Sequence, residues 1–270
     1  MWFGRPDPQK IGLSRPKIKD GDFAVAYAFR NCLQATIGGG TFTGQYAFYG
    51  AKAPKIGGGR FTTDFSFYAS EGPRISGGLF SGKMAFYGAS SAQVEEGDFQ
   101  GQWAFCEGQG VRILGGRFSG EGALSEAIQA VISGGAFSGP DFGITSRQMV
   151  VTGGEFSGAG LLKSSQNALV LGGWLGGEAA FESARNIGVL LDGEIREVRN
   201  PLSGVIAAKR IGRIVFDRGK PSDVIIISEA VGEGAVHADR IGPGCVPPAS
   251  REPDQALKTL QTLSDAIRSK

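Results

Sequence analysis

The chain has 270 residues and a formal net charge of +2, and it contains 45 glycines and 18 phenylalanines. Glycine at this level without a Gly-X-Y period excludes collagen, and a hydrophobic fraction of 41% excludes a disordered chain. The small net charge gives no electrostatic reason to expect a nucleic-acid partner, and the apolar runs are too short to span a bilayer. We therefore expect no nucleic acid and no membrane as partners.

The cysteines and the chain start indicate the compartment. Cys32, Cys106 and Cys245 are widely spaced and form no metal-binding pattern. Residues 1–6 are not a basic stretch followed by an apolar one, so they do not resemble a secretory signal. We expect reduced thiols in a cytoplasmic protein, with no metal site and no cofactor.

Residues 1–20 precede the first repeat of the chain. A repeat structure built from strands needs a cap, since an open end would pair with other chains. We expect this segment to form the N-terminal cap.

A 19-residue repeat follows, anchored on phenylalanine. Stepping from Phe23 without insertion gives this anchor series: Phe23, Phe42, Phe61, Phe80, Phe99, Phe118, Phe137, Phe156 and Leu175. A glycine stands two residues before each anchor, and a β-branched residue stands fourteen after it. The sixth position after the anchor is mostly aromatic: Phe29, Phe48, Phe67, Phe86, Phe105, Leu124, Gly143, Leu162 and Phe181. Columns that hold over nine units indicate a repeat architecture.

The period selects the kind of repeat. Helical repeats need about 30 residues or more and propeller blades about 40, and a leucine-rich repeat needs a leucine frame that is missing here. Short strands with glycine corners fit one coil of a solenoid. The sequence predicts an all-β, right-handed parallel β-helix over residues 21–241, with coils about 4.8 Å apart. After Val189 the period slips by one residue at Ile195, and irregular coils continue through residues 214–216 and 224–227.

The C-terminal part differs in composition. Residues 242–252 are rich in glycine and proline and are typical of a linker. Residues 253–270 place four apolar side chains at helical spacing: Leu257, Leu260, Leu263 and Ile267. A lone helix of this length must bury its apolar stripe, so we expect it to pack on the rod or to form a homodimer through the same helix of a second chain.

One segment resembles a known family. Residues 200–206, Asn-Pro-Leu-Ser-Gly-Val-Ile, and residues 211–217, Ile-Gly-Arg-Ile-Val-Phe-Asp, are similar to the C-terminal signature of an uncharacterised bacterial family of pectin-lyase-like β-helices. Residues 42–48 and 83–87 match its early coils, including an acidic residue and then a lysine, here Asp64 and Lys83. The likeness covers roughly residues 35–230 and departs at the Gly-Gly corners, where the family tends to have Asn and Cys. It implies the fold and no activity.

The candidate site depends on which side chains point outward. If the anchor and position six both face the interior, strand alternation places position four inside and positions three, five and seven outside. This adds five side chains to the core: Tyr27, Tyr46, Phe65, Met84 and Trp103. It also places a column of Ala and Ser between a tyrosine ladder and a polar ladder, which predicts a shallow groove. The predicted binding residues are Tyr49, Asp64, Tyr68, Lys83, Tyr87, Gln102 and Glu121.

The groove has two interpretations. It binds a small molecule or a carbohydrate, or its aromatic residues, stacked about 4.8 Å apart, stabilise a solvated face. In the second case Asp64 and Lys83 form an ordinary surface ion pair.

Catalytic candidates are few. Glu107 and Glu126 share position eight of adjacent coils, a spacing that suits a carboxylate pair, although charges at a corner are usually solvated. Asp64 and Lys83 are candidate acid/base groups, whereas Asp64 and Glu121 are three coils apart, too far for paired chemistry. His237 is the only histidine and lies near Asp239, where a structural or exposed role is expected.

Three functions follow from these observations. A non-catalytic binding or scaffold protein ranks first. The alternative is an intracellular enzyme acting on a small molecule or a carbohydrate in the groove. A polymer-degrading lyase ranks last, because it follows from fold analogy alone.

Overall fold

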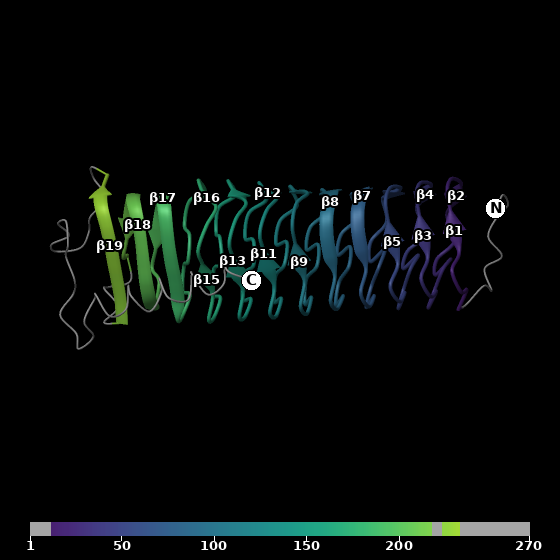
Figure 1. Cartoon of the computed structure of the whole chain (residues 1–270), viewed down its shortest axis with the longest axis horizontal. Coiled ribbons are helices and arrows are strands. Elements are labelled where there is room, and N and C mark those ends of the chain that lie inside the picture. Colours follow the sequence, from purple (N-terminus) through teal and green to yellow (C-terminus); the bar gives the residue numbers. More distant parts are fainter. Residues whose placement is uncertain (1–11, 218–222, 233–270) are drawn as a thin grey trace.

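A computed structural model describes residues 12–217 and 223–232 of the chain. These residues form an all-β parallel solenoid of about 11 turns, with no helix in this part (Figure 1). All pairings between its strands are parallel, and they join nineteen strands into one continuous sheet. The predicted all-β parallel coil architecture is therefore confirmed.

Most strands are two residues long, and those of the last turns are longer. Their bounds are β1 (Lys17–Ile18), β2 (Asp22–Phe23), β3 (Thr36–Ile37), β4 (Thr41–Phe42), β5 (Lys55–Ile56), β6 (Arg60–Phe61), β7 (Arg74–Phe80), β8 (Gln93–Phe99), β9 (Arg112–Ile113), β10 (Arg117–Phe118), β11 (Val131–Ile132), β12 (Ala136–Phe137), β13 (Val150–Val151), β14 (Glu155–Phe156), β15 (Leu169–Val170), β16 (Trp174–Leu175), β17 (Ile187–Arg199), β18 (Ser203–Val215) and β19 (Asp223–Val231).

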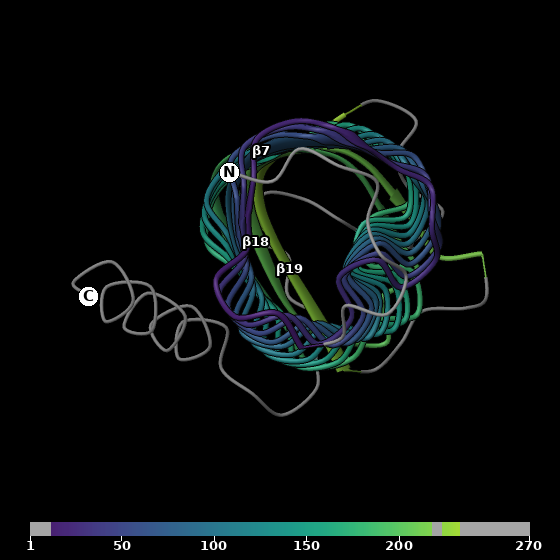
Figure 2. The same cartoon turned by 90° about the vertical axis from the view of Figure 1, so that its right-hand side faces the viewer.

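Residues that are 19 apart in the sequence pair with each other in adjacent coils. Phe42 pairs with Phe61 in one ladder, and Ile37 pairs with Ile56 in a second. A third ladder of single bridges begins at Ser14, which pairs with Leu33. Pairing thus starts within the segment that we expected to act as a cap. Seen along the axis, the coils superpose into one outline with an inward fold on one side (Figure 2).

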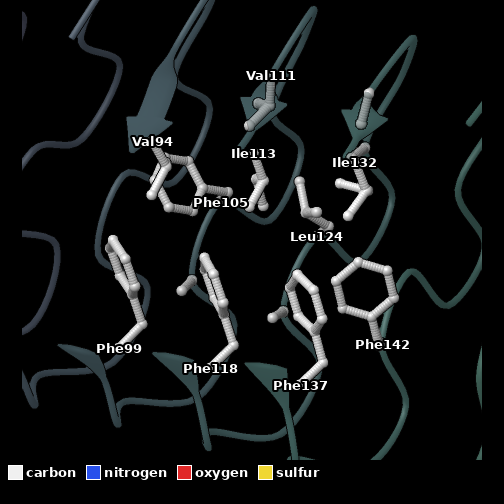
Figure 3. Close-up of a cluster of buried hydrophobic side chains, with 14 of the residues drawn as sticks. Val94, Phe99, Phe105, Val111, Ile113, Phe118, Leu124, Ile132, Phe137 and Phe142 are labelled. Carbon is white, nitrogen blue, oxygen red and sulfur yellow. The ribbon is translucent and has the colours of Figure 1, made fainter. Parts of the chain in front are cut away.

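Stacked phenylalanines fill the interior in two columns. Phe61 and Phe80 of the anchor column stack with ring centroids 4.8 Å apart, and Phe67 and Phe86 of the position-six column stack at 4.6 Å. The columns meet edge to face, as in Phe61–Phe67 at 5.1 Å. Figure 3 shows the anchor column facing Val111 and Ile113 across the interior. Offset and edge-to-face contacts are the favoured arrangements of aromatic rings, so the repeat supplies its own core.

Two glycine columns have different physical causes. Gly40, two residues before an anchor, has a φ of 97°, a conformation that side chains rarely adopt. Gly101 is required by close approach, since a Cβ there would lie 1.8 Å from the carbonyl oxygen of Gly82. Both columns let successive coils pack tightly.

The segment after each anchor is a turn and not a strand. Between residues 45 and 50 the backbone φ is positive at Tyr46 (56°) and at Gly50 (62°). The N–H of Phe48 donates to the carbonyl of Ser66 in the next coil (2.8 Å), while the N–H of Tyr49 donates to the carbonyl of Tyr46 (3.0 Å). Because φ changes sign along this turn, successive side chains do not alternate between interior and exterior as they do along an extended strand.

The period slips where the sequence predicts it. Leu175 pairs with Ile195, twenty residues later, and a bulge lies between Leu191 and Glu194 of β17. The irregular final coils are also present, as β18 and β19. The predicted linker at 242–252, the predicted helix at 253–270 and His237 lie outside the described residues. In the described part, no helix long and apolar enough to cross a membrane was found.

Candidate functional site

The interior and exterior of the turn segment differ from the predicted alternation at two positions. The position-five side chains are buried, including Ala47, Ser66 and Ala85. Position four faces outward instead: Tyr27 is 42% exposed, and Tyr46 is half-buried. The prediction that position four lies in the core is therefore wrong, and so is the groove floor of Ala and Ser. The alternating φ of the turn is the physical reason.

This reversal creates a larger aromatic surface than expected, which we call the aromatic face. Its first row is position four: Tyr27, Tyr46, Phe65, Met84 and Trp103. Its second row is position seven: Arg30, Tyr49, Tyr68, Tyr87 and Cys106. All of these side chains are exposed or half-buried except that of Cys106, which is buried.

Rings stack along each row and meet edge to face between the rows. In the first row Tyr46 lies 5.1 Å from Tyr27 and 5.0 Å from Phe65. In the second row, stacking extends from Tyr49 to Tyr68 and on to Tyr87, each step 5.4 Å. Tyr46 meets Tyr49 across the rows at 6.3 Å and 66°. The predicted stacking of the outward tyrosine ladder is confirmed.

The positively charged side chain of Arg30 lies at the N-terminal end of the aromatic face. The guanidinium of Arg30 lies 5.8 Å from the ring centre of Tyr27 and 5.4 Å from that of Tyr49. Both distances are within the range of a cation–π attraction. Arg30 therefore belongs to the site, although the sequence did not single it out.

The polar ladder at position three makes local contacts. The carboxylate of Asp64 accepts a hydrogen bond from the main-chain N–H of Lys83 (2.8 Å). In the described chain this main-chain contact takes the place of the ion pair considered from the sequence. Gln102 donates to the carboxylate of Glu121 (3.0 Å). The ammonium of Lys83 is exposed.

The catalytic candidates at position eight are exposed, as expected for a corner. The hydroxyl of Tyr87 donates a hydrogen bond to the carboxylate of Glu107. This bond raises the pKa of Tyr87, with burial and the Glu107 charge adding to the effect. Burial, together with the charges of Glu126 and Glu107, raises the pKa of Cys106 to about 11. Both groups stay protonated at neutral pH, so neither is activated as a nucleophile or base.

The described residues contain no group of three or more His, Cys, Asp or Glu side chains that could hold a metal ion. The polar groups of the aromatic face are instead tyrosine hydroxyls, the indole N–H of Trp103, the thiol of Cys106 and the guanidinium of Arg30. Such a face can bind by apolar contact and by hydrogen bonding.

The residue types at positions four and five of the repeat contain a signal that could have shown which of the two faces outward. Position five is small in coil after coil, whereas position four carries Tyr and Trp, whose polar tips need a partner when buried. An interior already filled by two phenylalanine columns has no room for a third large ring. Composition by column could therefore have placed the first row outside.

The geometry defines a class of protein: a parallel β-solenoid with a continuous aromatic face over its N-terminal half. A family described as "Protein of unknown function (DUF3737)" matches residues 79–227, which is more than half of the 270-residue chain. The chain belongs to this family. No curated protein and no solved structure matches the chain.

Proposed function

We propose that this protein is a non-catalytic binding scaffold whose aromatic face docks another macromolecular surface. The observation that carries the proposal is the pair of stacked aromatic rows on the outside of a regular rod. Tyr, Trp, Met and Arg are the residues that binding surfaces favour, and all four occur in these rows.

The way in which the rings stack selects the kind of partner. In a stacked row each ring face covers its neighbour, so the edges and the tyrosine hydroxyls point outward. Tyr68, for example, has Tyr49 on one side and Tyr87 on the other. A small sugar that stacks on a ring face has no open ring face at Tyr68. A broad surface that packs on ring edges fits better.

The alternative is an enzyme acting on a small molecule or carbohydrate, and one contact favours it: the hydrogen bond from Tyr87 to Glu107. Two observations weigh against it. The Ala and Ser residues that would have formed the floor of a groove are buried in the core. In addition, the raised pKa values of Tyr87 and Cys106 keep both groups protonated.

Further features are proposed on the resemblance and the sequence. We infer a right-handed winding, a relationship to pectin-lyase-like helices and a cytoplasmic location. What supports them is the segment at residues 200–217 and the reduced cysteines expected in that compartment.

Tyrosine footprinting tests docking directly. Oxidative modification of Tyr49, Tyr68 and Tyr87 would be compared between producing cells and dilute purified protein by mass spectrometry. Docking predicts protection of these three tyrosines in cells. Full modification of these tyrosines in both samples would contradict it.

Thermal shift separates docking from the enzyme alternative. A panel of hexasaccharides, nucleotides and amino acids would be screened against wild type and Tyr87→Phe, which removes the hydroxyl that contacts Glu107. The scaffold proposal expects no ligand-dependent stabilisation. A stabilising ligand whose effect is lost in Tyr87→Phe would favour the enzyme.

A further inference from the structure

We propose that the partner of the aromatic face is a second copy of this chain, packed antiparallel with its two-fold axis between the coils of Phe61 and Phe80. This inference rests on the proposed function, since it names the surface that docks there. It is carried by the order of residues along four outward columns: positions three, four, seven and eight.

The two-fold symmetry determines which coils of the two copies face each other. When two identical rods face each other about an axis that crosses them, each column faces the same column in reverse order. With the axis midway between the third and fourth coils, the coil of Phe61 faces the partner's coil of Phe80. The coils of Phe42 and Phe23 then face the partner's coils of Phe99 and Phe118.

The polar column is self-complementary under this operation. Asp64 faces Lys83 of the partner copy, and the symmetry produces the same pair a second time. Gln45 faces Gln102 of the partner copy. The exposed ammonium of Lys83 forms no ion pair or hydrogen bond within the described chain, so it is available for the intermolecular pair.

The aromatic rows also place apolar groups opposite apolar groups. Phe65 faces Met84 of the partner copy, and Tyr68 faces Tyr87. At the edge of the patch, Tyr27, which is 42% exposed, lies opposite Gly122, which is buried beside the ring of Trp103. Tyr46 faces Trp103 of the partner copy, so the rows bring large apolar and aromatic groups together at the centre of the patch, as interface cores favour.

Position eight allows the rods to approach. Ala69 faces Gly88 of the partner copy beside the axis, and both residues are small. Farther from the axis, Glu126 of the partner copy faces Asn31. The residue opposite Arg30 is Ser125 of the partner copy, next to Glu126 in the sequence. The Arg30 guanidinium therefore faces a region of negative charge. In these four columns no like charges face each other.

Other arrangements of the two rods lose the pairing of Asp64 with Lys83. Moving the axis onto the coil of Phe61 sets Asp64 against its own copy, and moving it onto the coil of Phe80 does the same for Lys83. A parallel pair, with position three facing position eight, sets Glu121 against Glu126 and leaves Lys83 opposite Gly88. Like charges brought together oppose association. An axis between the coils of Phe42 and Phe61 avoids like charges but leaves Asp64 opposite Gln45 and Lys83 opposite Ala26. The antiparallel arrangement with its axis between the coils of Phe61 and Phe80 is therefore selected, because it pairs Asp64 with Lys83.

Charge exchange tests the pairing in the full-length protein. Sedimentation velocity at low salt, from micromolar to submillimolar concentration, should show wild-type dimers. Asp64→Lys and Lys83→Asp should each weaken the dimer roughly 10- to 100-fold, because each creates two like-charge pairs. The double variant Asp64→Lys/Lys83→Asp should restore wild-type affinity, because the charges again alternate.

A matched control lies on another column of nearby coils. Lys52 and Glu71 form an exposed ion pair at 3.5 Å outside the aromatic face. Lys52→Glu should leave the dimer unchanged. Circular dichroism melts of every variant would separate lost association from lost folding. Lys83→Asp is the cleaner single variant, because Asp64 also holds a main-chain N–H.

Three outcomes would overturn the inference: a monomeric wild type at all concentrations, a dimer unaffected by Lys83→Asp, or a double variant that stays monomeric. A monomeric wild type with tyrosines protected in cells would leave the scaffold proposal standing with another partner. Unprotected tyrosines would remove both proposals.

Discussion

Asn200 and Asp217 hydrogen-bond to each other in both directions across the last coils of the solenoid. The side-chain amide of Asn200 donates to the carboxylate of Asp217, and the main-chain N–H of Asp217 donates to the amide oxygen of Asn200 (3.0 Å). Arg199 joins them by pairing with Asp217 (3.2 Å) and with the buried carboxylate of Glu197 (2.9 Å). These contacts tie β17 to the end of β18, where the regular period has already been lost.

Replacing Asn200 should therefore destabilise the C-terminal coils. Asn200→Ala removes both hydrogen bonds from a buried site and places alanine at a positive φ of 40°, for which we expect a loss of about 1–3 kcal/mol. Urea unfolding would measure it. Asn186→Ala is the matched control, because that exposed side chain makes weaker contacts; an equal loss in both variants would refute the special role of Asn200.

The position-six column should be far more sensitive than position seven. Phe86 is fully buried and stacks on Phe67 and Phe105, so Phe86→Ala should cost about 3–5 kcal/mol. Tyr87→Ala should cost clearly less, because Tyr87 is half-buried on the outer face. Denaturant melts of the two variants would show the order, and the reverse order would mean that the register is misassigned.

Adjacent positions four and five test the corrected orientation. Ala85 is buried, so Ala85→Leu should overpack the interior and cost about 1–3 kcal/mol. Met84→Leu changes a half-buried outer side chain and should be nearly neutral. Thermal unfolding of both proteins decides between the two orientations; a neutral Ala85→Leu would favour the simple strand alternation.

Two glycines, Gly101 and Gly110, should differ in how well they tolerate substitution by alanine. A Cβ at Gly101 would lie 1.8 Å from the carbonyl oxygen of Gly82, so Gly101→Ala must push two coils apart and should prevent native folding. Gly110 has a positive φ of 64° but no atom within 4 Å of a Cβ, so Gly110→Ala should cost only about 1 kcal/mol. Expression yield and melting temperature would distinguish them.

The thiol of Cys106 should resist alkylation at ordinary pH. Its pKa is raised to about 11 from 9.0, so iodoacetamide labelling in the folded protein should rise only near that higher pH. Because the folded pKa lies above the unfolded one, its contribution to stability is complete below pH 9.0 and is lost as the pH rises toward about 11. Mass spectrometry of labelled peptides across this range would check it, and fast labelling at pH 8 would contradict it.

The sequence by itself determined the period, the two buried phenylalanine columns and the slip at Ile195. These features depend only on spacing, because stacked coils must repeat the same residue type at the same distance. The outward tyrosine ladder also followed from spacing, since Tyr49, Tyr68 and Tyr87 neighbour buried position-six residues.

Only the tertiary structure decided the orientation of positions four and five and thus the real extent of the candidate site. Side-chain alternation holds for an extended backbone, whereas here φ turns positive at Tyr46 and at the equivalent residues of later coils. The spacing of residues in the sequence carries no information about φ. Strand alternation was therefore assumed, which placed Ala47 outside and Tyr46 inside. The pairing of Asn200 with Asp217 was likewise invisible, because the slipped period no longer says which residues of adjacent coils meet.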